Sequence, residues 1–433
     1  MSYSRVRSRQ KTKRKRRWPL FALLALIVVL VIGVGAYAAR IAGGGNHQAQ
    51  QPQTTASAGA SAGAASPGAA ASSATPDPQP QDSPEPSSPG ESPEPTVGGE
   101  PSASETPGAS DGAGQPGGTV TLAFVGDILP ASGVGKLMEQ HGVDYPFKLA
   151  KPILEAADIA AGNLEAPITE RGTPAENKTY VFKGKPAYLA GLKNAGLDVV
   201  GLANNHTLDQ GWEGLSDTMD ALDDIKLKHM GSGADDKEAF APVYMEHGGI
   251  NVAYIAVSNV VPEGSWKAGP NHPGVAETYD TTRAVAAVKE ARKLADIVVV
   301  MVHWGNERAD TPKKAQFDVG HTLIDAGADL IIGSHPHVLQ GFEAYKGKWI
   351  AYSLGNFVFT TREGYSKTQD TGILTATCNA DGACELKFDP MYAKDSQPRP
   401  MEPEQAQALF DRLNKVSYGA AIDSNGLIKA RAR

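Results

Sequence analysis

The chain has 433 residues, of which 41% are hydrophobic and 21% are charged, and its formal net charge at pH 7 is −7. This acidic balance excludes a protein that binds nucleic acid through a broad basic face, because such binding needs cations that displace counterions from the phosphates. The length allows two or three domains of average size, but residues 1–118 differ in composition from the rest.

The N-terminus combines a basic tail with an apolar segment. Residues 1–18 carry nine Lys or Arg and no acidic residue, and residues 19–39 read PLFALLALIVVLVIGVGAYAA. About 20 apolar residues span a bilayer as a helix, and a basic flank keeps that end in the cytoplasm. We therefore predict a cytoplasmic tail at 1–18 and an uncleaved transmembrane signal anchor at 19–39. A cleaved signal peptide is the alternative, because Ala36–Ala38 reads AYA, a small-residue cleavage pattern.

The segment that follows has the composition of a stalk. Ala, Ser, Gly, Pro, Thr and Gln dominate it, and no Lys or Arg occurs between Ile41 and Gly118. Such a sequence buries too little apolar surface to offset the entropy lost on ordering, and its proline-rich stretches favour extended conformers. We predict a disordered stalk at 40–118 that holds the rest of the chain away from the membrane, outside the cell.

From Thr119 onward, strand-like apolar runs alternate with helix-like segments. Short apolar strands separated by helices of ten to fifteen residues are typical of an α/β domain with strands buried on both faces. We predict one such domain at 119–395, followed by a C-terminal helix and tail at 396–433. The predicted strands are 119–127, 159–163, 197–205, 249–258, 296–305 and 328–335, and the predicted helices are 145–158, 186–196, 212–224, 281–295 and 315–327.

Polar side chains stand at the carboxyl end of each of five predicted strands. Ligands of open α/β sheets bind beyond these ends, and carboxylates, amides and imidazoles are metal ligands and acid–base catalysts. An isolated histidine at a strand end is more often structural, but five coincidences at one edge indicate a functional site. The residues are Asp127; Asn163 and Glu165; Asn204, Asn205 and His206; His303 and Glu307; His335 and His337.

Six motifs in a fixed order carry a resemblance to a known family. Between Thr121 and Phe359 the chain resembles the bacterial capsule-synthesis proteins of the CapA or PgsA type, associated with poly-γ-glutamate. That family is similar in turn to the calcineurin-like metallophosphoesterases, which implies a layered sandwich of two mixed β-sheets flanked by helices. The motifs are FVGD, GNLEAPI, ANNHTLDQG, VHWGNE, GSHPHVLQ and YSLGNFVF.

The resemblance implies a role for each matching residue. It assigns catalytic roles to Asp127, Glu165 and His206, with His206 assisting as an acid. The metal ligands it implies are Asp127, Asn163, Asn205, His303, His335 and His337. In GSHPH, Pro336 restricts the loop backbone while the two imidazoles reach one site.

Two departures from the metallophosphoesterase pattern limit this assignment. Leu129 stands where the superfamily has the histidine of Asp-x-His, and Asn163 stands where it has a bridging aspartate. A neutral amide bridges two cations poorly, so we expect one divalent metal ion at most, and a site without metal is equally compatible. With a metal, the predicted reaction is hydrolysis or transfer at a phosphoester or amide. Without one, the same carboxylates and histidines allow acid–base chemistry.

Four further residues are predicted to support the site or to contact substrate: Asn204, Trp304, Glu307 and Asn356. Trp304 is either a stacking platform or a core residue, and Asn356 is expected to hydrogen-bond the HPH loop. Three lysines in NKTYVFKGKP, residues 177–186, either face an anionic polymer or belong to a solvated loop. Asp209 and Gln210 are interpreted as turn and helix-cap residues rather than as chemistry.

Cys378 and Cys384, the two cysteines of the chain, flank an Asp-Gly turn in a predicted hairpin, ILTATCNADGACELKFD. In an oxidising exterior we expect a disulfide between them. A zinc-binding pair is the alternative, but no nearby His or third Cys supports it.

Two functions remain open from the sequence. The first is a membrane-anchored, extracellular enzyme of capsule or poly-γ-glutamate-type polymer synthesis or export. The second is a non-catalytic factor that binds the polymer and supports membrane-embedded synthase subunits; a plain metallophosphoesterase ranks behind both. The expected partners are an anionic polymer or cell-wall material and the membrane, with no nucleic acid.

Overall fold

The computed structural model describes residues 118–361 and 366–431. The predicted tail at 1–18, the anchor at 19–39 and the stalk up to residue 117 lie outside the described residues. Among the residues that are described, no helix combines the length and the hydrophobicity needed to cross a membrane.

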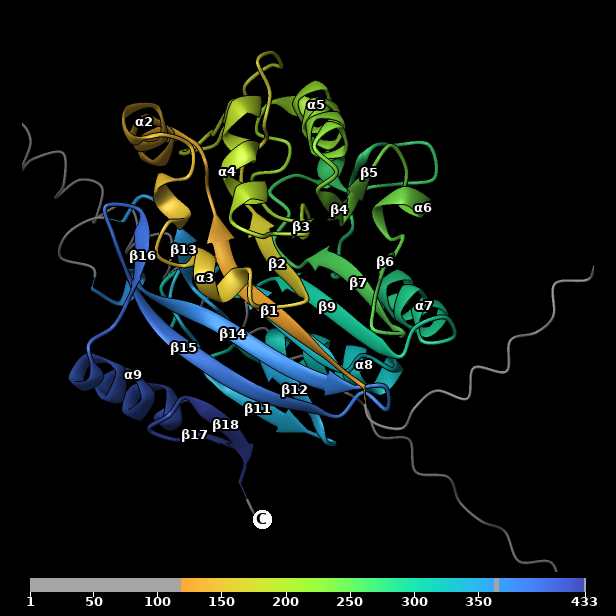
Figure 1. Cartoon of the computed structure of the whole chain (residues 1–433). Helices are drawn as coiled ribbons and strands as arrows, with labels where there is room; N and C mark the ends of the chain where they lie inside the picture. The colour runs from red at the N-terminus through yellow and green to blue at the C-terminus, as the bar shows by residue number, and fades with distance from the viewer. Residues whose placement is uncertain (1–117, 362–365, 432–433) are drawn as a thin grey trace, which may run out of the picture. The chain divides into compact units, whose positions relative to one another are not determined.

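Two mixed β-sheets form the framework (Figure 1). In the first sheet the order is β17 (Ala420–Ile422), β18 (Leu427–Ala430), β15 (Cys384–Lys394), β14 (Asp370–Asn379), β1 (Thr119–Ile128), β2 (Ile159–Leu164), β3 (Val199–Gly201) and β4 (Lys228–Met230), with β13 (Asn356–Val358) paired to β1 and β16 (Gln397–Pro400) paired to β15. The second sheet runs β11 (Phe342–Tyr345), β12 (Lys348–Ala351), β10 (Leu330–Ser334), β9 (Ile297–His303), β7 (Ile250–Ser258) and β6 (Val243–His247), and β5 (Ser232–Gly233) pairs with β8 (Gly274–Val275).

Most helices cover the outer faces of the two sheets, whereas the last one packs on the core between the sheets. The longer ones are α2 (Ser132–His141), α4 (Leu189–Asn194), α5 (Gly211–Asp224), α7 (Thr282–Ala291), α8 (Lys314–Ala326) and α9 (Pro403–Lys415), and short turns are α3 (Lys151–Leu154), α6 (Asp236–Ala239) and the 3-10 segments η1 (Tyr145–Phe147), η2 (Pro186–Tyr188), η3 (Gly264–Trp266) and η4 (Ser366–Thr368). One apolar core lies between the sheets, a second joins the first sheet to α2–α5, and a third joins the second sheet to α7 and α8. The predicted layered α/β sandwich of two mixed sheets flanked by helices is confirmed.

The parallel strands point their carboxyl ends toward the functional edge. Strands β1 to β4 run parallel to one another in the first sheet, and β7, β9, β10 and β12 run parallel in the second. Of these strands, β1, β2, β9 and β10 are buried along almost their whole length, which explains why their sequences show apolar runs without alternation. The site therefore draws on two sheets that pack face to face.

The segment predicted as a single helix at 145–158 is broken into η1 and α3. Pro146 and Pro152 each occupy the first turn of one of these short elements. Proline lacks an amide hydrogen and clashes with the preceding turn, so each proline starts a new turn instead of extending the previous one.

Residues after 395 do not form a separate tail. Strand β16 pairs with β15, β18 also pairs with β15, and β17 pairs with β18. Helix α9 buries Leu409, Phe410 and Leu413 in the core between the sheets. The described part of 396–433 therefore continues the same domain, because its strands extend the first sheet.

A disulfide joins Cys378 in β14 to Cys384 in β15, directly opposite each other in the hairpin. It closes a small loop, for which chain-entropy estimates give a stabilisation of about 2 kcal/mol. Replacing both cysteines with alanine is expected to lower the free energy of unfolding by about that amount in chemical denaturation. Reduction of the disulfide in the parent protein is expected to have the same effect. Equal denaturation midpoints for the oxidised parent and the variant would contradict this prediction.

Candidate functional site

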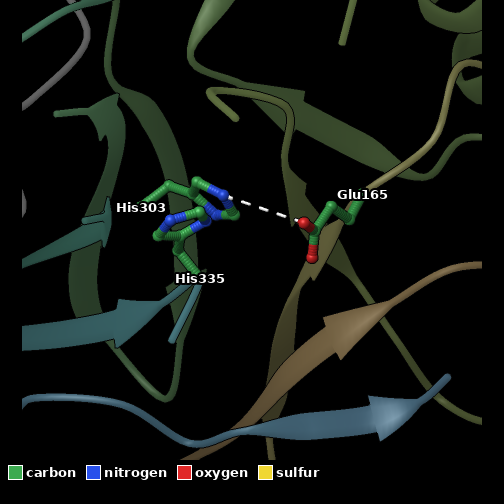
Figure 2. A group of neighbouring side chains, drawn as sticks. All are labelled: Glu165, His303 and His335. Atoms are coloured by element: carbon green, nitrogen blue, oxygen red, sulfur yellow. Dashed lines mark ion pairs between the residues drawn. The ribbon is translucent and has the colours of Figure 1, made fainter. Parts of the chain in front are cut away.

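The predicted site residues come together from both sheets. Asp127 ends β1, Asn163 lies in β2, and Glu165 follows β2 directly. From the second sheet, His303 ends β9, and His335 stands just beyond β10. Figure 2 shows the two imidazoles on one side and the Glu165 carboxylate on the other, pointing toward one another.

Asn163 connects the two sheets instead of standing free as a ligand. Its Nδ2 donates to Asp127 Oδ1 at 2.8 Å and lies 3.3 Å from His303 Nδ1, while its Oδ1 accepts from Asn204 Nδ2 at 3.2 Å. His303 Nδ1 also lies 3.1 Å from Ser334 Oγ. Asn163 is therefore suited to orient the carboxylate and the imidazole, which is a different task from the ligand role that the resemblance implies.

Glu165 is a buried carboxylate that no described group hydrogen-bonds. The residue is 0% exposed, and both carboxylate oxygens lack a hydrogen-bond partner. Its Oε1 lies 3.8 Å from His303 Nε2 and 3.8 Å from His337 Nε2. Burial, followed by the negative charge of Asp127, raises the pKa of Glu165 well above its usual range. A buried carboxylate without hydrogen bonds costs stability, and a cation bound between Glu165 and the imidazoles would compensate this cost.

The two histidines of the HPH loop have different electrostatic environments. Burial and the neighbouring His337 lower the pKa of His335 to about 3, and its Nδ1 has no hydrogen-bond partner. For His337 burial opposes the charged form, but the hydrogen bond and charge of Asp127 outweigh it and raise the pKa. Its Nδ1 lies 3.2 Å from Asp127 Oδ2. Both residues have positive φ, 92° and 57°, a backbone region that non-glycine residues rarely occupy and that clusters at functional sites.

Two overlapping groups have the geometry of metal ligands. One consists of Glu165, His303 and His335, and the other of Asp127, Glu165 and His337; in each group the ligand atoms lie within 4.8 Å of one another. Carboxylate and imidazole together suit zinc and similar divalent ions. The fit is supported by the unpartnered oxygens of Glu165 and the unpartnered Nδ1 of His335. Glu165 belongs to both groups.

His206 is held by a pair of buried charges. Its Nδ1 lies 2.7 Å from Asp209 Oδ2, and Asp209 also pairs with the ammonium group of Lys178. Burial lowers the pKa of His206, and the hydrogen bond and charge of Asp209 oppose this shift. In the neutral ring the contact assigns the proton to Nδ1, which leaves the lone pair on Nε2 for proton exchange.

The remaining predicted residues fall into different positions. Asn205 Oδ1 lies 2.7 Å from His303 Nε2, beside the first ligand group, and Asn204 supports the backbone of His206 through its Oδ1. Asn356 lies 2.9 Å from His337 Nδ1 through its Oδ1 and donates to the His337 carbonyl, so it contacts the HPH loop. Glu307 is exposed next to this loop region and acts on the site only through its charge.

Trp304 lies in the core and offers no surface for substrate stacking. Its residue exposure is 0%, it packs in the third core, and its Nε1 donates to the Tyr352 carbonyl at 2.8 Å. Of the two interpretations that the sequence left open, the core residue is confirmed and the stacking platform is not. Successive side chains of a strand point to opposite faces, so the neighbour of a site histidine is directed away from the site.

The sequence interpretation missed Asp209 and Lys178. Asp209 is fully buried and binds His206, Lys178 and the Phe182 amide, whereas α5 has Gln210 at its N-cap position, without a side-chain capping bond. Asp209 does lie in the turn before α5, as predicted, but its carboxylate also holds His206, which the sequence interpretation did not assign; its spacing of three residues from His206 is the signal that could have identified this contact. The lysines of 177–186 do not form a common face, because each has its own partner within the domain.

Comparisons with known proteins agree with the motifs. The model of the bacterial capsule synthesis family PGA_cap matches residues 121–361. The PGA biosynthesis protein CapA of Bacillus subtilis (strain 168) is 33% identical over 302 residues, 69% of this chain and 78% of that protein. The capsule biosynthesis protein CapA of Bacillus anthracis is 32% identical over 287 residues, 65% of this chain and 69% of that protein. A probable polyglutamine synthesis accessory protein of Mycobacterium tuberculosis is 34% identical over 226 residues, 49% and 59% of the two chains.

Solved structures give only distant similarities. A phosphatase of Mycoplasma pneumoniae matches with a TM-score of 0.39 and 12% identity, over 68% of this chain and 99% of that chain. The NAD nucleotidase of Haemophilus influenzae matches with a TM-score of 0.38 and 12% identity, over 69% and 57%. The family model and the CapA relatives are decisive, and the chain belongs to the bacterial capsule synthesis family PGA_cap.

Proposed function

We propose that this protein is a membrane-anchored, extracellular accessory protein of capsule polymer synthesis with a hydrolytic site that uses one divalent metal ion. The observation that carries the proposal is the Glu165 carboxylate, which is fully buried, lacks hydrogen-bond partners and lies between imidazoles. The polymer is proposed to be poly-γ-glutamate or a related anionic chain, as the names of the CapA relatives suggest.

The metal would be held by Glu165 together with His303 and His335, or with Asp127 and His337. A divalent ion in such a site lowers the pKa of a bound water molecule and polarises the bond to be cleaved. Asn163 keeps Asp127 and His303 in orientation through its amide.

His206 is the residue suited to move a proton at the leaving group. Asp209 holds its Nδ1, so that Nε2 is the nitrogen left to exchange a proton with substrate. The side chains of His206 and His337 retain 9% and 14% exposure, while that of His303 retains 1%. Substrate would therefore approach along His206 and His337.

The localisation belongs to the same proposal and rests on the sequence. The basic tail at 1–18 and the apolar segment at 19–39 would place the globular domain outside the cell. The disulfide between Cys378 and Cys384 supports an oxidising location.

Metal analysis tests the proposal directly. The full-length protein is expected to contain close to one divalent ion per chain by mass spectrometry. His303→Ala and His335→Ala are expected to lose it if the first ligand group holds the ion, and His337→Ala if the second does, because each removes one of three protein ligands. His321→Ala is the matched control, since His321 pairs with Glu343 far along the second sheet and touches no proposed ligand. A metal-free parent protein would refute the metal mechanism.

A hydrolysis assay distinguishes the proposed enzyme from a protein that only binds the polymer. The metal-loaded protein is expected to shorten poly-γ-glutamate or to cleave p-nitrophenyl phosphate, and His206→Gln is expected to reduce the rate by about 100-fold or more. The alternative is a polymer-binding factor without catalysis, and the near-complete burial of Glu165 and His303 favours it. Retained polymer binding with no cleavage of either compound would decide for that alternative.

A further inference from the structure

We propose that Lys178 is a positioning residue, whose ammonium group locks the loop 170–185 onto Asp209 and thereby fixes the orientation of His206. The inference rests on the proposed function in one respect, namely that His206 exchanges a proton with substrate. It concerns a residue on a loop between β2 and η2, far in sequence from the histidine on which it acts.

The ammonium group of Lys178 is surrounded by groups of the site. Nζ donates to the Asn205 carbonyl at 2.6 Å and to Asp209 Oδ1, lies 3.3 Å from His206 Nδ1 itself, and lies 4.8 Å from the centroid of the Trp266 ring. The side chain is only 12% exposed. A carbonyl, a carboxylate and an aromatic face together occupy the surroundings of the cation, so Lys178 acts through other residues rather than on substrate.

Asp209 links the ammonium group of Lys178 to the ring of His206. Its side chain is 0% exposed; Oδ2 lies 2.7 Å from His206 Nδ1 and accepts the Phe182 amide hydrogen at 2.7 Å, while Oδ1 accepts from Lys178. A buried carboxylate without its cation would lose its main compensating charge. Loss of Lys178 would therefore disturb the position of the Asp209 carboxylate, whose Oδ2 holds the His206 ring.

The same loop also covers His206 with an aromatic ring. Phe182 lies with its ring centroid 4.6 Å from that of His206, and its carbonyl accepts from Gln210 Nε2 at 2.9 Å. Tyr180 stacks on Phe182 with a centroid separation of 6.3 Å and is 57% exposed. The loop thus covers one side of His206, and Lys178 attaches the loop to Asp209 and Asn205 through its ammonium group.

The neighbouring lysines of the loop have other partners and serve as comparison. Lys183 is exposed and donates to the Glu170 carbonyl, and Lys185 pairs with Glu139 on α2. Neither contact involves Asp209 or His206. Lys183→Gln is therefore the matched control, because it removes the same charge from the same loop without touching the proposed anchor.

The test uses the full-length protein and two readouts that do not depend on activity. In Lys178→Gln the Phe182 amide is expected to exchange its hydrogen at least about tenfold faster, because local opening becomes easier. The ring ¹⁵N signals of His206, assigned with His206→Gln, are expected to change from a single Nδ1–H form to a mixture of both tautomers. Lys183→Gln is expected to retain parent values in both measurements.

Chemical rescue distinguishes the ammonium group from general damage to the fold. Cys378 and Cys384 are joined in a disulfide, so Lys178→Cys provides a single free thiol that 2-bromoethylamine converts into a lysine analogue after reversible unfolding. The alkylated protein is expected to recover the parent tautomer and exchange rate. If Lys178→Gln does not fold, the comparison of alkylated and unmodified Lys178→Cys decides instead.

Parent-like His206 signals in Lys178→Gln, or a disturbed tautomer that alkylation of Lys178→Cys does not restore, would overturn the proposal. Failure of the proposed function has a different signature, because a parent protein without hydrolysis leaves the tautomer and exchange measurements intact. The two hypotheses can therefore fail separately.

Discussion

Replacing Glu165 with glutamine is expected to weaken binding of a divalent ion by at least about 100-fold, the upper end of the losses seen when even a supporting residue of a metal site is removed. Glu165 is common to both ligand groups, so no alternative group of three survives the change. The neutral amide has nearly the same size but presents no negative charge to the ion. Calorimetric titration of the metal-free protein with Zn²⁺ or Mn²⁺ measures the effect.

The control for this experiment is Glu307→Gln. Glu307 is exposed and belongs to neither ligand group, so its replacement removes one nearby charge without removing a ligand. We expect Glu307→Gln to bind the ion with close to parent affinity. Equal affinities of Glu165→Gln and the parent protein would show that any bound metal is held elsewhere.

Replacing Trp304 with alanine is expected to lower the free energy of unfolding by about 3–5 kcal/mol, the range found for large aromatic residues removed from cores. The side chain is fully buried, stacks near Tyr352 at 5.8 Å between centroids, and donates its indole hydrogen to a backbone carbonyl. Truncation leaves a cavity and an unsatisfied acceptor together. Chemical denaturation monitored by circular dichroism measures the loss.

Trp212→Ala provides the matched control. Trp212 is 36% exposed at the start of α5, and substitutions at such surface positions change stability by about 0.5 kcal/mol or less. A small effect at Trp304, close to that at Trp212, would contradict the core placement and restore its interpretation as a surface for stacking.

The comparison of sequence and structure is most informative at the histidines. The positions of His303, His335 and His337 after apolar strands were enough to predict a functional edge, because strand ends can be located from hydrophobic runs. The prediction did not show that the edge belongs to two sheets. Asp127 and Asn163 lie in the first sheet and His303 in the second, and only the packing of the sheets brings them within hydrogen-bond distance.

What the sequence leaves open at Trp304 and Asp209 has a common physical origin. The neighbours of each residue in sequence do not show its role, because both roles depend on contacts with distant segments. Tyr352 accepts the indole hydrogen of Trp304, and Lys178 pairs with Asp209 across 31 positions of the chain. Local sequence shows residue type and spacing but not which side chain is buried against which.

The family and the α/β class follow from the sequence alone, and so does the prediction of most residues of the candidate site, because motif order and apolar runs can be recognised without knowing the tertiary contacts. It also carried the prediction of an anchor and stalk at 19–118. The three-dimensional packing was needed to show that Glu165 has no hydrogen-bond partner, that Asn163 orients other residues, and that Lys178 reaches the histidine site. Burial and pairing of charges arise when two sheets and a loop close on one another, and desolvation then sets their chemistry.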